Sequence, residues 1–168
     1  MKKRIGIIGV LVAILALGIG YAVIDATVLN VTGDGTIVAD PDNFDVHFKE
    51  SEEVEKTGPA GATLTAAHTG PTTATIKVEN FTKKDDEATF VYTIENSSAD
   101  LKADLEVGTI VNSNSEYFTI DAVLGKAKLN AAGDTTTLTV TVTAIKTPIA
   151  ADQTTNITVP VTATPVHA

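Results

Sequence analysis

The chain has 168 residues, with 21 acidic and 12 basic side chains and no cysteine. Its formal net charge of −9 repels nucleic acid and anionic lipid headgroups, so neither is an expected partner. Without cysteine the chain forms neither a disulfide framework nor a thiolate metal site, and its hydrophobic core alone must hold the fold.

The first 22 residues have the pattern of an export signal. A basic stub at residues 2–4 precedes an uncharged apolar run over residues 5–17, and the small residues Gly20 and Ala22 have the spacing of a signal-peptidase site. We expect this segment to form a hydrophobic signal helix that a signal peptidase removes by cutting after Ala22. Everything that follows is then placed outside the cytoplasm.

A membrane anchor is the alternative for the same segment. Residues 5–24 carry no charge, and about 20 such residues are enough to cross a bilayer. In that case the segment would tether the domain, and the N-terminal segment would be the chain's only contact with the membrane. Both interpretations predict a secreted or cell-surface domain over residues 23–168.

Residues 23–31 become the new N-terminus if the signal is removed. Both alternating sets of positions in this segment are mainly apolar, whereas an edge strand wet on one face needs only one apolar set. A strand that inserts into another subunit's groove uses both sets, so the segment is a candidate donor strand for polymerisation. The alternative is that residues 23–31 form the domain's own first strand, buried on both faces. The apolar residues in question are Val23, Ile24, Ala26, Val28, Leu29 and Val31.

Beyond residue 43 the dominant sequence period is two, which is typical of half-buried strands. The 101–107 run also contains good helix formers, but its clean alternation favours a strand, and the acidic segment 50–55 is expected to be a solvated loop. Turn residues separate the alternating runs. The expected strands cover residues 44–48, 74–78, 90–94, 101–107, 118–122, 138–142 and 157–163.

So many short one-faced strands cannot all be buried by one flat sheet. Two sheets packed face to face solve this problem, so the sequence predicts an all-β fold. We expect a two-sheet β-sandwich of jelly-roll or immunoglobulin-like type, preceded by the signal helix. No repeat or break in composition divides residues 23–168, which indicates a single domain.

The sequence offers no motif for catalysis or for a cofactor. The three histidines, His47, His68 and His167, lie far apart, and none belongs to a His-Glu-x-x-His zinc motif. There is no Gly-x-Ser-x-Gly nucleophile elbow and no phosphate-binding glycine loop. We therefore predict a non-enzymatic protein without a cofactor. Loop carboxylates could hold calcium, but none has the spacing of a calcium-binding loop.

Several stretches together resemble a known family. They are Gly-Ile-Gly-Tyr-Ala at 18–22, Val-Ile-Asp-Ala-Thr-Val-Leu-Asn-Val at 23–31, Asn-Phe-Asp-Val-His-Phe at 43–48, Phe-Val-Tyr-Thr-Ile-Glu-Asn at 90–96 and Leu-Asn-Ala-Ala-Gly-Asp-Thr at 129–135. This pattern resembles the TasA and camelysin group of exported proteins, which are matured by a SipW-type signal peptidase. The resemblance covers the N-terminal 50 residues best, and the rest only as a plan of strands and turns.

The resemblance implies a jelly-roll fold and a structural role in extracellular biofilm fibres. In such fibres the N-terminal segment of one subunit completes a sheet of the next. Some members of the group have been described as metalloproteases, but no motif in this sequence carries that activity over. The expected partners are therefore other copies of the same chain, and the signal peptidase during export.

A monomeric adhesin or carbohydrate-binding module is the alternative function. Such modules usually present exposed aromatic rings to sugars. In this chain most aromatic residues occupy inward positions of the expected strands, and Phe81 and Tyr117 are the exceptions. A hydrolase whose metal site is assembled from distant residues ranks last. The sequence thus favours a subunit of an extracellular fibre, biofilm matrix or surface filament.

Overall fold

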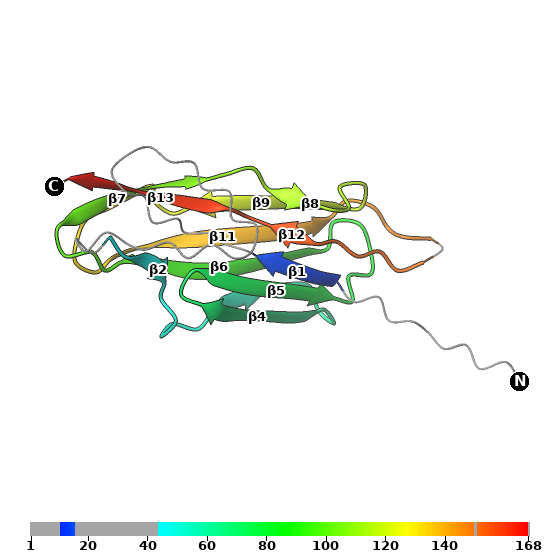
Figure 1. Ribbon diagram of the computed structural model, residues 1–168. Helices are drawn as coiled ribbons and strands as arrows, with labels where there is room; N and C mark the ends of the chain where they lie inside the picture. Colours follow the sequence, from blue (N-terminus) through cyan, green and yellow to red (C-terminus); the bar gives the residue numbers. More distant parts are fainter. Residues whose placement is uncertain (1–10, 16–43, 150, 168) are drawn as a thin grey trace, which may run out of the picture.

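The computed structural model (Figure 1) describes residues 11–15, 44–149 and 151–167, and these residues form strands and no helix. The all-β prediction is therefore confirmed for the described part of the chain. The strands are β1 (Leu11–Leu15), β2 (Val46–Phe48), β3 (Glu55–Thr57), β4 (Thr63–Gly70), β5 (Thr73–Glu79), β6 (Glu87–Asn96), β7 (Leu101–Val107), β8 (Val111–Asn112), β9 (Phe118–Leu124), β10 (Lys128–Leu129), β11 (Asp134–Ala144), β12 (Ile157–Thr158) and β13 (Val161–His167).

All pairings between these strands are antiparallel. The largest sheet has the order β2-β6-β11-β9, with β3 also paired to β6. The other strands form the groups β1-β5-β4, β10-β7-β13 and β12-β8. The long axes of the strands lie along the length of the molecule (Figure 1). Buried residues from the different sheets form one hydrophobic core. This arrangement is consistent with a β-sandwich.

The core takes alternate residues from each long strand, as the period of two predicted. In β6 the residues from Ala88 to Asn96 alternate between buried and half-buried positions, and β11 does the same over Leu138 to Ala144. The largest fully buried side chains are Tyr92, Phe48, Phe90, Ile76, Ile94, Leu129, Leu138 and Ile157. Removing these side chains from water is the main favourable contribution to folding.

The strands expected from the alternating sequence are all present, with shifted ends. The 101–107 segment is strand β7, so the choice of strand over helix is confirmed. The expected strand at 157–163 is divided into β12 and β13 on either side of Pro160. Because proline has no backbone N–H, it cannot continue the hydrogen-bond ladder. The Pro160 carbonyl still accepts a 2.8 Å hydrogen bond from the Gly108 amide.

The expected signal helix is not tested by the structure, which describes only five residues of the export segment. Leu11–Leu15 forms strand β1, and the remainder of the export segment lies outside the described residues. A signal helix satisfies its own backbone hydrogen bonds, which is what a lipid environment demands. Folded with its own domain, Leu11–Leu15 instead satisfies its backbone on the edge of β5. The helix predicted for the leader in a membrane stays a prediction.

The turn before β6 depends on one buried carboxylate. Asp86 is only 4% exposed, and its Oδ2 accepts hydrogen bonds from the backbone amides of Thr82 (2.7 Å) and Lys83 (3.1 Å). Burial by itself would raise the pKa of Asp86, but the two amide donors outweigh it and hold the pKa below its usual value. The ionised carboxylate therefore fixes the backbone of this turn.

We expect Asp86→Asn to destabilise the fold by about 1–2 kcal/mol at pH 7, because a neutral amide accepts the same bonds more weakly. Since the folded-state pKa is depressed, this contribution is full above the unfolded-state pKa and is lost as pH falls through the folded-state pKa. Urea unfolding of both proteins at pH 7 and pH 3 measures the effect. The stability difference should shrink in acid, and a constant difference would contradict the assigned role.

Candidate assembly site on strand β5

Strand β5 presents one face to the core and one to solvent. Ala74, Ile76 and Val78 are buried, while the residues between them are half-buried. Apolar residues alternate with polar ones in β5, and this pattern suits a strand with one face on the core and the other in water. The strand ends at Glu79, and the next residue, Asn80, has a φ of 65°, which the extended backbone of a strand does not adopt.

The two long edges of β5 carry different neighbours. On one edge β4 forms an antiparallel pair with β5 across a tight connection. On the other edge lies β1, in a register that places Leu11 opposite Val78, Ala13 opposite Ile76 and Leu15 opposite Ala74. The three buried residues of β5 are thus the ones that the register matches to the first, third and fifth residues of β1.

Beyond β1 lies strand β12. Cα atoms of β1 and β12 come within 8 Å of each other, and Figure 1 shows the blue β1 between the orange β12 and the green β5. Stacked sheets lie about 10 Å apart, so this spacing places β1 beside β12 rather than across the core from it. Strand β1 therefore occupies a slot whose walls are β5 and β12. We call this the β5–β12 slot.

The walls of the β5–β12 slot are apolar on their core side. With β1 in place, Val78 of one wall and Ile157 of the other are both fully buried. Without a strand in the slot, the backbone N–H and C=O groups on this edge of β5 would lack partners, and the core beneath would meet water. An empty slot is thus a strong acceptor for another strand.

The solvent side of β5 carries a cation. Lys77 Nζ lies 2.9 Å from Glu79 Oε1, with the two side chains 35% and 16% exposed. In the register of β1 the residue opposite Lys77 is Val12, and the residue opposite Thr75 is Ile14. The outer face of β5 is therefore polar, whereas its present neighbour supplies only apolar residue types.

An aromatic cluster fixes the β4–β5 hairpin on the large sheet. The His68 ring of β4 lies 5.6 Å from the Phe48 ring and 5.8 Å from the Tyr92 ring, measured between centroids. The Tyr92 hydroxyl donates a 3.3 Å hydrogen bond to the Thr75 carbonyl, and burial raises the pKa of Tyr92 far above its usual value. These contacts join the β4–β5 hairpin to the large sheet, so the position of β5 does not depend on β1 alone.

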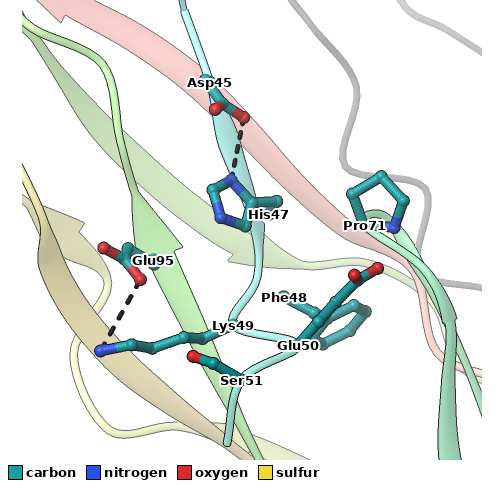
Figure 2. A pocket seen from close by; sticks show the side chains of 8 residues that line it. All are labelled: Asp45, His47, Phe48, Lys49, Glu50, Ser51, Pro71 and Glu95. Carbon is teal, nitrogen blue, oxygen red and sulfur yellow. Dashed lines mark hydrogen bonds and ion pairs between the residues drawn. The ribbon is translucent and has the colours of Figure 1, made fainter.

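A second surface feature is an open, charged depression beside β2 (Figure 2). His47 Nδ1 lies 2.9 Å from Asp45 Oδ1, and Lys49 Nζ lies 3.7 Å from Glu95 Oε2. Dashed lines in Figure 2 mark both pairs. These charges are paired with one another, and the aromatic ring at the floor, Phe48, is fully buried. The depression therefore presents no accessible aromatic ring to a sugar.

The residues predicted to carry function are not placed by the structure. The donor strand with Val23, Ile24, Ala26, Val28, Leu29 and Val31, and the cleavage residues Gly20 and Ala22, lie outside the described residues. Within the described part of the chain, no group of three or more histidine, aspartate or glutamate side chains is arranged to hold a metal ion. That part also contains no helix with the length and apolarity needed to span a membrane.

Sequence reasoning missed strands β3 and β4. In β4 the half-buried residues Leu64, Ala66 and His68 alternate with exposed residues, which are threonine except for Ala67. This apolar pattern is weak, so the sequence did not mark β4 as a strand. Strand β3 has three exposed residues and continues the acidic segment expected to be a loop, so that expectation is wrong at Glu55. Only backbone pairing with β6 makes β3 a strand.

Comparisons of this chain with protein-family models, with curated proteins and with solved structures found no match.

Proposed function

We propose that this protein is a structural, non-enzymatic subunit of an extracellular fibre or surface filament. The leader at residues 1–22 directs export, and residues 23–31 of one subunit complete the sheet of another. The fold assigned to it within the all-β class is a two-sheet sandwich of jelly-roll or immunoglobulin-like type. The proposal includes membership of the family that the sequence resembles, the TasA and camelysin group.

One observation supports the proposal: Leu11–Leu15, a segment of the predicted leader, occupies the β5–β12 slot. Cleavage after Ala22 removes that segment and leaves the edge of β5 without its partner. The same cut frees residues 23–31, which have the composition of a strand. A chain that has both a vacant slot and a free strand assembles head to tail, and a heterologous contact of this kind produces open filaments.

The burial of aromatic side chains favours this function over the carbohydrate-binding alternative. Phe44, Phe48, Phe90, Tyr92 and Phe118 are all buried, as their inward positions predicted. Phe81 and Tyr117 are partly buried, and the Lys146 ammonium lies 4.9 Å from the centre of the Tyr117 ring. Among the described residues no aromatic ring stands free for stacking on a sugar.

Deleting residues 23–31 from the cut chain tests the function. We expect a folded, soluble monomer that forms no filaments, measured by electron microscopy and sedimentation of purified protein. A synthetic peptide of residues 23–31 should also slow the growth of wild-type filaments, because it fills acceptor slots without extending the chain.

Two controls make the deletion decisive. Thermal unfolding should show that the deleted chain keeps its fold, since the donor segment serves the neighbouring subunit. If the deletion unfolds the domain, residues 23–31 are its own first strand and the proposal is wrong. Filaments of normal appearance from the deleted chain would contradict it equally.

A further inference from the structure

The register of β1 on β5 contains information about what replaces it. Leu11, Ala13 and Leu15 lie opposite the buried Val78, Ile76 and Ala74. The middle pair thus matches a small residue of the incoming strand with a large residue of β5, and the outer positions take large residues. A replacement strand should repeat this large–small–large order at alternate positions, because it would meet the same buried side chains.

The segment released by cleavage contains this order once. Ala26 is the only alanine in residues 23–31, and its neighbours two positions away are Ile24 and Val28. Setting Ala26 in the place of Ala13 puts Ile24 in the place of Leu11 and Val28 in the place of Leu15. No other alignment puts a small apolar residue opposite Ile76.

The intervening positions give an independent comparison. In this alignment Asp25 falls opposite Lys77, and Thr27 falls opposite Thr75, where the leader has Val12 and Ile14. Opposite charges and paired threonines at directly opposed positions stabilise an antiparallel pair. The Lys77 side chain is 35% exposed and lies on the solvent side of β5, so it is accessible to a carboxylate on an adjacent strand.

We propose that residues 24–28 of a second copy occupy the β5–β12 slot, antiparallel to β5, with Ile24 opposite Val78 and Asp25 opposite Lys77. In the uncut chain Leu11–Leu15 holds the same position and the same register. The inference rests on the proposed function and adds to it the acceptor strand and the register. The occupant is a second copy, because each cut subunit supplies one free segment and one vacant slot.

Single-cysteine cross-linking tests the register directly, since the chain contains no cysteine of its own. Cut chains carrying Thr27→Cys are mixed with cut chains carrying Thr75→Cys, allowed to assemble, and oxidised. Directly opposed residues have the Cα separation that a disulfide requires, whereas positions two residues away do not. Non-reducing gels should show a dimer that reduction removes.

The matched controls pair Thr27→Cys with Thr73→Cys or with Lys77→Cys, each two residues away along β5. Cross-linking with Thr75→Cys should exceed both by about tenfold. A preference for either control would show a different register. A cut chain that carries both Thr27→Cys and Thr75→Cys and cross-links only within itself, running as a monomer on the gel, would show that the occupant is not a second copy. Normal filaments without a cross-link to any β5 cysteine would place the acceptor elsewhere and overturn the inference alone. Absence of filaments from the wild-type cut chain would instead overturn the proposed function.

Exchange of charges provides a second measurement that needs no thiol. Asp25→Lys and Lys77→Asp should each slow filament growth severalfold, because like charges then lie opposite each other. The double variant should recover most of the rate. Failure of the double variant to recover would contradict the pairing of these two residues. Thermal unfolding of the Lys77→Asp chain should confirm that its fold is retained.

Discussion

The uncut chain of residues 1–168 is expected to remain monomeric under conditions in which the chain cut after Ala22 assembles into filaments. The reason is competition within one molecule. Leu11–Leu15 already pairs with β5, and an attached strand has a far higher effective concentration than a strand from another subunit. If the leader fills the slot in nine of ten molecules, the apparent affinity for a donor falls about tenfold.

The measurement uses one protein before and after cleavage. A protease site placed ahead of Val23, chosen so that the cut leaves Val23 first, converts a soluble uncut sample into the mature form. Sedimentation and electron microscopy should show filaments only after the cut. Equal rates of assembly before and after cleavage would show that the leader does not block the slot.

A proline in the leader is the matched control. Ala13→Pro removes a backbone donor from the middle of β1 and disfavours its pairing with β5. The uncut Ala13→Pro chain should therefore assemble more readily than the uncut wild type. After cleavage the two proteins are identical, so any remaining difference in assembly would have another cause.

Asn96→Ala is expected to destabilise the domain by about 3–4 kcal/mol, a large part of the stability of a typical domain. Asn96 is fully buried at the end of β6, and its Nδ2 donates hydrogen bonds of 2.9 Å to the carbonyls of Leu101 and Asn130. Its Oδ1 accepts a hydrogen bond from the Ser98 amide at 3.1 Å. Alanine would leave all three backbone groups without this partner.

Urea unfolding of Asn96→Ala against wild type measures the loss. Asn130→Ala is the control, because the Asn130 side chain is exposed and its carbonyl, which Asn96 binds, is kept. We expect the control to change stability by less than about 0.5 kcal/mol. Equal effects of the two substitutions would show that the buried contacts of Asn96 are not what holds this end of the sheet.

The strands that the sequence predicted are those whose apolar residues occur at every second position and are the residues that the fold buries. Phe90, Tyr92 and Ile94 alternate with threonine, valine and glutamate, and they are buried as that period requires. The choice of strand over helix at β7 succeeded for the same reason, although its residues also favour a helix. The expected strand at 157–163 is interrupted at Pro160, which the alternating pattern by itself did not indicate.

The strands that were missed lack this alternation of buried apolar and exposed polar residues. Strand β3 is exposed at every residue, so nothing in its side chains marks it as a strand. Strand β1 has an apolar sequence suited to a membrane helix, and its pairing with β5 depends on a vacancy that only the folded domain creates. Local sequence carries no information about which backbone edges a distant part of the chain leaves unpaired.

By itself the sequence determined the all-β class and the position of most long strands. A strand with one face in water and the other in the core needs alternating polar and apolar residues, and this alternation can be read directly from the sequence. It also determined that residues 23–31 are apolar at both alternating sets of positions. Only the tertiary structure decided that β5 and β12 bound a slot, and that Leu11–Leu15 of the predicted leader lies in it. The physical reason is that strand pairing joins backbone groups far apart in the chain, and those groups are the same in every residue except proline.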